Sequence, residues 1–464
     1  MQRTRHARRA GAIVGGAILG LLALLALILV PGGPLAAKLG IQPLCMDGDW
    51  PHVRVVSCPV PATAAPTATA WALPTPLPAT GTATREPVAA TETPTLTPPP
   101  TARPSAIPSP EPSPSRPAAG ATAPEEQIAA GLQELAAEGR FSGAILIAKG
   151  GEPVLKQAYG LADRDLGTPN QVDTRFNLGS MDKMFTAIAI LQLAEQGKLS
   201  LQGTIADYVP DYSDQPVARS VTIHQLLTHT SGMGDYFESP RFGELRIRLR
   251  SVEDYVALFV DAPLEFQPGE QVRYSNSGYT VLGLIVEKVT GQSYYDYVRQ
   301  EILEPSGMSD TGAYELDAHA PNLARGYTRF DAQYQETGEI RDNSSLLPMK
   351  GGPAGGGYST VEDLLRFSNA LLAHKLLSPA STELALAPQV RLGENAQYGY
   401  GFMNRGGQGQ RIVGHGGGAP GVCSMLNIFL DLGYTTVVLT NGDEDCLAAY
   451  EIVKAALLPE TEAP

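Results

Sequence analysis

Proline is concentrated in one stretch of the chain, and this stretch limits where the chain can fold. Residues 61–124 contain 17 of the 38 prolines, and most of their other residues are alanine or threonine. A segment of this composition has no apolar periodicity to bury, so we predict a disordered linker. In polyproline II conformation it would reach at most on the order of 200 Å. The folded domain is therefore expected at residues 125–464.

The N-terminus is typical of a membrane anchor. Four arginines within residues 1–10 precede twenty uncharged residues, Gly11 to Val30. At about 1.5 Å per residue, such a helix spans a hydrocarbon core of about 30 Å. We predict a cytoplasmic basic tail (1–10), a single-pass transmembrane signal anchor (11–30) and a short extracytoplasmic segment (31–60), which place the C-terminal domain outside the cell membrane. A cleaved signal peptide and a secreted protein are the alternative.

Four cysteines agree with an extracytoplasmic location. Cys45 lies near Cys58 in the sequence, and Cys423 lies near Cys446, so two local disulfides are the simplest of the three possible pairings. Four unpaired buried thiols are the alternative for a cytoplasmic protein. The chain contains no Cys-x-x-Cys or His-x-x-x-His spacing, so we predict no metal site, and we expect no cofactor.

The charge of the folded part argues against a nucleic-acid partner. The whole chain has a formal net charge of −14, and residues 1–124 carry nine basic and five acidic side chains. Residues 125–464 therefore carry 25 basic and 43 acidic side chains, a net charge of −18. Binding to phosphates needs clustered cations, which an acidic domain does not provide.

The pattern of the folded domain is typical of an α+β fold. Apolar periodicity and turn signals predict helices at residues 125–138, 182–196, 279–289, 361–374 and 448–457, and strands at residues 143–148, 153–159, 425–430 and 435–440. Residues 184–194 are almost continuously apolar, so their helix should be buried on most sides. Strands near both ends predict one antiparallel sheet built from both chain ends, flanked by helices, with a mainly helical insertion.

Ser180 and Lys183 lie at the start of the predicted buried helix. A helix N-terminus offers free backbone N–H groups and a partial positive charge, which help a nucleophilic oxygen and the oxyanion that it generates. Lys183 follows at the third position, on the same helix face, and a desolvated lysine can take the hydroxyl proton of Ser180. A serine that only caps the helix and a solvated surface lysine are the alternatives.

Two further segments supply polar groups of the kinds that acyl transfer needs. Tyr274 and Asn276 precede an apolar helix: the phenol can act as a base or relay a proton to a leaving group, and the amide can donate to a substrate carbonyl. His415 opens a run of glycines before a predicted strand, where a substrate backbone can approach closely. The backbone N–H of Gly418 is a candidate oxyanion donor together with that of Ser180. A polar capping segment and a flexible glycine loop are the alternatives.

The chain from about residue 125 to residue 458 resembles the serine β-lactamase-related family, which includes class C β-lactamases, D-alanyl-D-alanine carboxypeptidases, D-aminopeptidases and related esterases. The resemblance rests on six segments in order: Phe176-Asn177-Leu178-Gly179-Ser180 with Lys183, Gly197-Lys198-Leu199-Ser200-Leu201, Leu226-Leu227-Thr228-His229-Thr230-Ser231-Gly232-Met233, Tyr274-Ser275-Asn276-Ser277-Gly278-Tyr279, Ala354-Gly355-Gly356-Gly357-Tyr358-Ser359-Thr360-Val361-Glu362-Asp363 and His415-Gly416-Gly417. No Gly-x-Ser-x-Gly elbow occurs, so an α/β-hydrolase lacks its nucleophile here.

The resemblance implies roles for single residues. Ser180 matches the acylated nucleophile, Lys183 its proton partner, Tyr274 the general base or acid, and Asn276 the amide that contacts substrate. His415 fills the third motif, where class C β-lactamases usually carry Lys-Thr-Gly, so a cation for a substrate carboxylate is in doubt. The motif around His229 is interpreted as a structural turn outside the catalytic set, and the following loop, residues 233–242, is expected at the pocket mouth.

The expected function is that of a membrane-anchored extracytoplasmic serine hydrolase that acts on amide or ester bonds through an acyl-enzyme. The tether and the linker bring cell-wall peptide within reach, which favours a D-alanyl peptidase or carboxypeptidase. His415 keeps an esterase or a D-aminopeptidase open, and a true β-lactamase ranks lower. The partner would be a small-molecule or peptide substrate. A non-catalytic receptor that binds peptide or glycan in the same pocket is the alternative from another class.

Overall fold

The computed structural model describes residues 44–47, 54–57 and 123–458, except residues 319, 332–334, 394–395, 408–409 and 444. The predicted tail, membrane anchor and nearly all of the linker lie outside these residues, as does Cys58 of the first predicted disulfide. Within the described part of the chain, no helix has the length and apolar character needed to cross a membrane. The N-terminal unit contains an antiparallel hairpin of strands β1 (Leu44–Asp47) and β2 (Arg54–Ser57).

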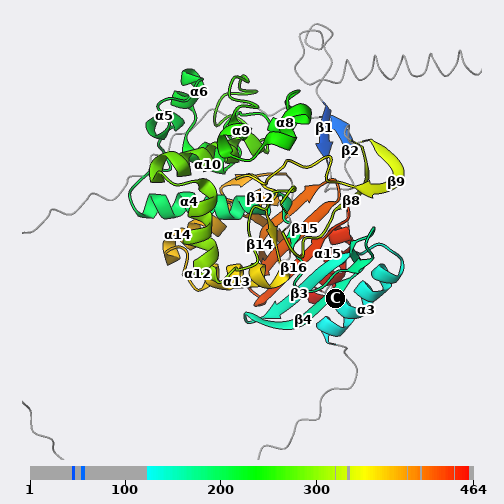
Figure 1. Ribbon diagram of the computed structural model, residues 1–464. Helices are drawn as coiled ribbons and strands as arrows, with labels where there is room; N and C mark the ends of the chain where they lie inside the picture. Colours follow the sequence, from blue (N-terminus) through cyan, green and yellow to red (C-terminus); the bar gives the residue numbers. More distant parts are fainter. Residues whose placement is uncertain are drawn as a thin grey trace, which may run out of the picture. The chain divides into compact units, whose positions relative to one another are not determined.

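The folded domain is built on an eight-stranded antiparallel sheet (Figure 1). The strand order is β11-β12-β13-β14-β15-β16-β3-β4, so the last strand pairs with the first strand of the domain. The strands are β3 (Gly143–Lys149), β4 (Glu152–Tyr159), β11 (Val390–Arg391), β12 (Ala396–Tyr398), β13 (Met403–Gly407), β14 (Gln410–Ala419), β15 (Val422–Phe429) and β16 (Tyr434–Thr440). The prediction of one antiparallel sheet from both chain ends is confirmed.

Three two-stranded sheets accompany the main sheet. They are β5 (Leu161–Asp163) with β6 (Thr168–Pro169), β7 (Phe176–Asn177) with β10 (Tyr358–Ser359), and β8 (Tyr327–Phe330) with β9 (Glu336–Asp342). The second pair matters for the site, because it joins the segment before Ser180 to the segment after residue 357.

Helices cover both faces of the main sheet (Figure 1). The flanking helices are α3 (Pro124–Ala137), α4 (Asp182–Glu195), α13 (Val361–Leu372), α14 (Pro379–Leu386) and α15 (Asp445–Leu457). The helical insertion contains α5 (Ile205–Tyr208), α6 (Gln215–Ser220), α7 (Ile223–Leu227), α8 (Phe242–Leu245), α9 (Val252–Val256), α10 (Asn276–Thr290), α11 (Tyr294–Val298) and α12 (Glu304–Ser306), with the short turns η2 (Tyr236–Glu238), η3 (Arg246–Arg248) and η4 (Arg299–Leu303). The mainly helical insertion is thus confirmed.

The two faces of the sheet belong to two apolar clusters. Along β15, Leu426 points into the larger cluster with α4 and α10, whereas the adjacent Met425 points into the cluster with α3 and α15. Successive side chains of a strand point to opposite faces, so a strand covered on both sides buries all of its side chains. This explains why β15 and β16 are buried at every position.

The helix that carries the candidate site is buried on nearly all sides, as its continuous apolar stretch predicts. All residues of α4 from Asp182 to Leu193 are buried. Phe185 packs edge-on against Phe367 of α13, with ring centroids 5.0 Å apart. A helix held on all sides fixes the position of the residues at its start, which include both members of the Ser-x-x-Lys motif.

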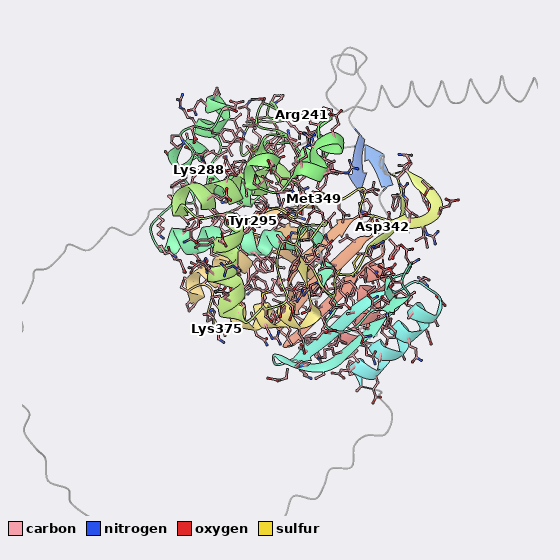
Figure 2. The ribbon with its side chains drawn as sticks, in the orientation of Figure 1. Arg241, Lys288, Tyr295, Asp342, Met349 and Lys375 are labelled. Carbon is pink, nitrogen blue, oxygen red and sulfur yellow. A yellow bond between two sulfur atoms is a disulfide. The ribbon has the colours of Figure 1, made fainter. Side chains whose placement is uncertain are left out.

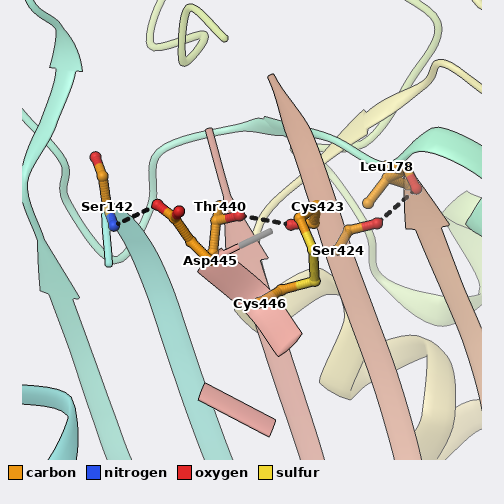
Figure 3. The surroundings of a disulfide bond; sticks show 7 residues. All are labelled: Ser142, Leu178, Cys423, Ser424, Thr440, Asp445 and Cys446. Atoms are coloured by element: carbon orange, nitrogen blue, oxygen red, sulfur yellow. Dashed lines mark hydrogen bonds between the residues drawn. A yellow bond between two sulfur atoms is a disulfide. The ribbon is translucent and has the colours of Figure 1, made fainter. Parts of the chain in front are cut away.

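The second predicted disulfide is confirmed. Cys423 of β15 is bonded to Cys446 of α15, which ties the closing helix to the sheet (Figure 3). The bond closes a loop with a sequence separation of 23 residues, which corresponds to about 3 kcal/mol of stabilisation in the chain-entropy picture. Hydrogen bonds support the same corner: Thr440 donates to the carbonyl of Cys423 at 2.8 Å, and the backbone N–H of Ser142 donates to Asp445 at 3.1 Å.

Candidate active site

Ser180 and Lys183 lie side by side at the start of α4. Ser180 belongs to a single 3₁₀ turn, η1 (Gly179–Met181), which leads directly into the helix. The Lys183 Nζ atom is 3.2 Å from the Ser180 Oγ atom. Ser180 is partly exposed, whereas Lys183 is fully buried. The nucleophile candidate is thus open to a substrate while the amine beside it is shielded from water.

The surroundings of Lys183 favour an uncharged amine. Its Nζ atom donates to the Asn276 side-chain oxygen and to the backbone carbonyl of Ala354, both at 2.6 Å. Burial lowers the pKa of Lys183 to about 7, although the carboxylates of Asp235 and Asp182 oppose the shift. A neutral amine has two N–H groups and one lone pair. Because the two acceptors take the N–H groups, the lone pair is left for the hydroxyl of Ser180.

Tyr274, which lies just before α10, places its ring next to the Lys183 amine. It immediately precedes Ser275, whose hydroxyl caps the helix by accepting from the N–H of Gly278 at 3.0 Å. The Lys183 Nζ atom lies 4.7 Å from the centroid of the Tyr274 ring. Burial raises the pKa of Tyr274 well above its ordinary value, and the nearby Ser180 hydroxyl offsets the rise only in part. Tyr274 is therefore a neutral phenol with a buried hydroxyl that has no hydrogen-bond partner among the described residues.

Asn276 is the first residue of α10, and both ends of its amide are engaged. Its oxygen accepts from Lys183, and its Nδ2 atom donates to the Asp235 carboxylate at 2.6 Å. The same carboxylate accepts from the backbone N–H of Asn276 at 3.2 Å. Asp235 lies in the loop that the sequence placed at the pocket mouth, but its contact with Asn276 could not be read from that position. One Nδ2 hydrogen remains for the substrate carbonyl proposed from sequence.

The glycines of β14 let the sheet approach the Ser180 segment. A Cβ atom on Gly417 would lie 1.9 Å from the carbonyl oxygen of Leu178, so only glycine fits. That carbonyl accepts from the Ser424 hydroxyl at 2.7 Å (Figure 3). Gly179 has a φ of +50° and its own missing Cβ would lie 2.8 Å from the backbone nitrogen of Gly418. These contacts bring Gly418 next to the residue before Ser180.

A cavity of about 50 Å³ opens beside Ser180, and the described residues that line it include no charged side chain. The lining includes Ser180, Asn276 and Gly418 of the predicted site. The other described lining residues are polar, apolar or glycine: Asn177, Gly179, Tyr236, Phe237, Tyr314, Leu316, Leu346, Leu347, Pro348, Gly351, Ala354, Gly355, Gly356, Tyr358, Ala419 and Pro420. Tyr236 and Phe237 come from the loop expected at the pocket mouth, which agrees with that prediction.

Comparison with known proteins identifies the family. The family model Beta-lactamase matches residues 126–457. This chain belongs to the β-lactamase family. Penicillin-binding protein 4* of Bacillus subtilis is 32% identical over 337 residues, which are 70% of this chain and 73% of that protein. Esterase EstB of Burkholderia gladioli is 31% identical over 304 residues, which are 58% and 76% of the two chains.

A solved structure agrees with the sequence relatives. The penicillin-binding protein from Bacillus halodurans matches with a TM-score of 0.64 and 33% identity, over 70% of this chain and 99% of that one. The resemblance inferred from the six ordered segments is thus confirmed. As a β-lactamase-family member with these relatives, the chain is a serine hydrolase.

His415 lies elsewhere in this β-lactamase-family domain than the sequence suggested. The sequence predicts it directly before a strand, but it lies inside β14, and its side chain is fully buried. Its Nδ1 atom is 2.5 Å from the carbonyl oxygen of Gly416, and its Nε2 atom is 3.0 Å from the Tyr398 hydroxyl. A carbonyl only accepts, so Nδ1 carries the proton and Nε2 accepts. The imidazole is fully buried and is not among the described residues that line the cavity.

Burial also keeps His415 uncharged. It lowers the pKa of His415 to about 3, and the nearby Lys183 acts in the same direction. At neutral pH the third motif of this family member therefore supplies no cation. The His415 side chain instead contacts Tyr398. The Tyr398 ring also packs against the ring of His229.

His229 is a neighbour of the site that the sequence assigned only to a turn. Its backbone has a φ of +60°, which fits the turn. Its buried ring lies 4.3 Å from the Tyr274 ring, centroid to centroid, and its Nδ1 atom accepts from the N–H of Ser275 at 3.1 Å. Burial lowers the pKa of His229 well below its ordinary value, so the ring is neutral. His229 thus positions the Tyr274 segment without reaching the cavity.

Proposed function

We propose that this domain hydrolyses ester or amide bonds through an acyl-enzyme on Ser180. The observation that carries the proposal is the pair of atoms at the start of α4: a buried amine with a pKa of about 7 lies 3.2 Å from a partly exposed hydroxyl. A general base is most effective when its pKa lies near the working pH. Lys183 meets this condition at neutral pH, whereas Tyr274, with its raised pKa, does not.

The proposed reaction has two halves. Neutral Lys183 takes the proton of Ser180 while Oγ forms a bond to the carbonyl carbon, and the backbone N–H groups of Ser180 and Gly418 stabilise the oxyanion. The oxyanion then collapses and the bond to the leaving group breaks. Tyr274 passes its proton to the departing oxygen or nitrogen and regains one from the lysine ammonium. Water next attacks the carbonyl carbon of the acyl-enzyme, and the protons follow the same path in reverse. Tyr274 accepts a proton from the water and passes one to Lys183. Lys183 returns a proton to the Ser180 Oγ atom as the acid is released.

We propose further that the substrate is uncharged where it meets the cavity. A substrate carboxylate would need a cation, yet the described lining contains none, and the family position that often holds lysine is a neutral, buried His415. Leucines, tyrosines and a phenylalanine line the cavity instead. This chemistry favours a neutral ester or amide with an apolar group, as in an esterase, over a carboxypeptidase that recognises a terminal carboxylate.

A matched pair of peptides tests this selectivity. We expect N-acetyl-D-alanyl-D-alaninamide to be hydrolysed with kcat/KM equal to or higher than that of the corresponding free acid, because a carboxylate gains no partner here. A p-nitrophenyl butyrate ester should be hydrolysed faster than either. A preference of about tenfold or more for the free acid, or efficient hydrolysis of the carboxylate-bearing nitrocefin, would contradict the proposed selectivity. Absence of turnover on all four compounds, with no covalent labelling by a fluorophosphonate, would instead contradict the hydrolase function.

We propose that Asp235 is a positioning residue for this reaction. Asp235→Ala should lower kcat/KM by about 10- to 100-fold, because a hydrogen bond to a charged group is worth about 1.5–3 kcal/mol and Asn276 would lose this support. Asp235→Asn should move the pH midpoint of kcat/KM to lower pH, since the carboxylate raises the pKa of Lys183. The nearby Glu238→Gln, which removes only a surface ion pair with Arg273, serves as the control. An unmoved midpoint in Asp235→Asn would exclude the electrostatic part of this role.

We propose that the domain is tethered outside the cell membrane by residues 11–30. The uncharged apolar stretch after four arginines supports this, and so does the disulfide Cys423–Cys446, because disulfides persist mainly in oxidising compartments. The full chain should stay with membranes in alkaline carbonate, and protease added to intact cells or spheroplasts should release the domain by cutting within residues 61–124. Recovery from the medium with an N-terminus after residue 30 would show signal cleavage instead, and recovery from the cytosol would contradict both.

A further inference from the structure

A second cavity lies behind the segment that lines the first one, and it is the larger of the two. Its volume is about 400 Å³, against about 50 Å³ for the cavity beside Ser180. Pockets that bind small molecules usually measure about 300–1,000 Å³. The wall between the two cavities includes Gly352 and Gly357, at either end of the segment that carries Ala354, and Tyr314 lines both cavities.

An incompletely satisfied carboxylate lies in the lining of this second cavity. Asp182 is 7% exposed, and its Oδ2 atom accepts from the backbone N–H of Gly357 at 2.6 Å. A carboxylate can accept about four hydrogen bonds, yet no other donor and no ion pair reaches Asp182 from the described residues. The helix dipole stabilises the negative charge of Asp182 in part, because Asp182 lies at the start of α4. A buried carboxylate with one donor is costly unless a further partner is present.

The rest of the lining is suited to an organic cation. Tyr294 and Tyr295 lie in the lining with their hydroxyls already engaged, by Thr186 at 2.7 Å and by the carbonyl of Gly351 at 3.0 Å. Tyr295, labelled in Figure 2, is the residue whose hydroxyl donates to Gly351. The Lys350 Nζ atom already lies 4.0 Å from the centroid of the Tyr295 ring, so the Tyr294 ring is the one left for cation–π contact, and both rings offer apolar contact.

The cavity carries excess negative charge. Its only cation among the described lining residues is Arg299, which is paired with Asp296 at 3.2 Å and with Glu304 at 2.5 Å. Asp182 makes no direct ion pair with a described residue, although the neighbouring Lys183 amine lowers its pKa. Burial raises the pKa of Asp182 to about 7, and the N–H of Gly357 and the Lys183 amine offset the rise only in part.

We propose that this second cavity binds a small organic ammonium ion, with the ammonium group against the Asp182 carboxylate and its apolar part against the tyrosine rings. The site is separate from Ser180 and does not depend on the hydrolase function. It shares the Gly352–Gly357 segment with the Lys183 environment, because Ala354 in that segment accepts from Lys183. Occupancy would therefore stabilise the segment that supports the amine.

Benzylamine and benzyl alcohol, which share one ring and differ in charge, test the proposal by calorimetric titration into the full-length protein. We expect benzylamine to bind and benzyl alcohol to bind at least about tenfold more weakly. Asp182→Asn, which keeps an acceptor for Gly357, should weaken benzylamine by about tenfold or more. Ala313→Trp should abolish binding by filling the cavity with a large side chain. Asp296→Asn, the acid that already has a partner, should change the affinity little.

Three results would overturn the proposal. The first is equal binding of benzylamine and benzyl alcohol. The second is an unchanged benzylamine affinity in both Asp182→Asn and Ala313→Trp. The third is the absence of binding heat when wild-type protein is titrated with up to about 10 mM benzylamine, a concentration beyond the weak end of small-ligand affinity. Ser180→Ala and protein labelled at Ser180 by a fluorophosphonate should both bind benzylamine like wild type. Loss of binding in either would place the amine in the first cavity and also count against the second site.

Discussion

Replacing Ser180 with alanine should lower kcat/KM for a neutral ester by about 10⁴- to 10⁶-fold, as removal of the nucleophile does in serine hydrolases. The Oγ atom forms the bond to the acyl group, and no other hydroxyl of the described cavity lining lies beside the Lys183 amine. Intact-mass spectrometry after quenching should detect the acyl-enzyme in the wild type and none in Ser180→Ala. The variant should unfold near the wild-type temperature, since Ser180 is partly exposed and its hydroxyl contributes a hydrogen bond with Lys183 rather than apolar packing.

Ser277→Ala is the matched control for this experiment. Ser277 is buried one residue beyond Asn276, and its hydroxyl has no hydrogen-bond partner among the described residues. Removal of that hydroxyl should leave kcat/KM within about threefold of wild type, because it neither reacts nor positions another group. If Ser180→Ala retained more than a hundredth of wild-type activity while Ser277→Ala lost it, Ser180 would not be the nucleophile.

The elements near the site could be predicted because their signals are local. The apolar stretch of α4 identifies a buried helix, and Ser275 and Gly291 mark the two ends of α10, where Gly291 has a φ of +72°. The hairpin between β3 and β4 follows from the turn residues at 149–152. The pairing of β16 with β3 joins strands from the two ends of the domain. It could be predicted because the sequence indicates strands near both ends, although no residue contact between them could be predicted.

The contacts that tune the site could not be predicted, because they join segments far apart in the chain. Lys183 receives its two acceptors from Asn276 and from the backbone of Ala354, 93 and 171 residues away. A backbone carbonyl leaves no mark in a sequence. The motif at residues 228–232 did mark His229, but its ring was read only as part of a turn.

His415 illustrates the same limit. A glycine run before a strand and a glycine run within a strand look alike in sequence, and the register decides which side chain faces the cavity. Here residue 417 faces the backbone carbonyl of Leu178. It must be glycine, because a Cβ atom at this position would clash with the carbonyl oxygen. Since side chains alternate along a strand, the direction of each β14 residue is then determined by this one close approach and by pairing with β15.

Burial decides between the two proton carriers that the sequence left open. The same low-dielectric surroundings lower the pKa of Lys183 to about 7 and raise the pKa of Tyr274, because desolvation disfavours the charged form of each. One group becomes a base at neutral pH and the other stays a proton donor. On this ground we propose that Lys183 is the base and Tyr274 the proton donor, so the pH dependence of the reaction should report the titration of Lys183.

Replacing Lys183 with methionine should lower kcat/KM by about 10²- to 10⁴-fold, the usual contribution of a general base. In the wild type, kcat/KM should rise with pH through about 7, because the amine accepts the Ser180 proton only after losing its own. The rise should be absent in Lys183→Met. Methionine fills similar volume but leaves the Asn276 oxygen and the Ala354 carbonyl without this donor, a cost of about 1–3 kcal/mol for each buried group, so the thermal unfolding of the variant is measured alongside its activity.

Lys288→Met is the control, because Lys288 is a surface lysine whose 3.3 Å ion pair with Asp211 lies away from the cavity. It should keep both the wild-type rate and the rise through pH 7. Rates measured between pH 5 and 9 on a neutral ester keep the substrate charge constant, so the midpoint belongs to the enzyme. A flat wild-type profile, or a rise that persists in Lys183→Met, would transfer the base role from Lys183 to another group and leave Tyr274 as the first candidate.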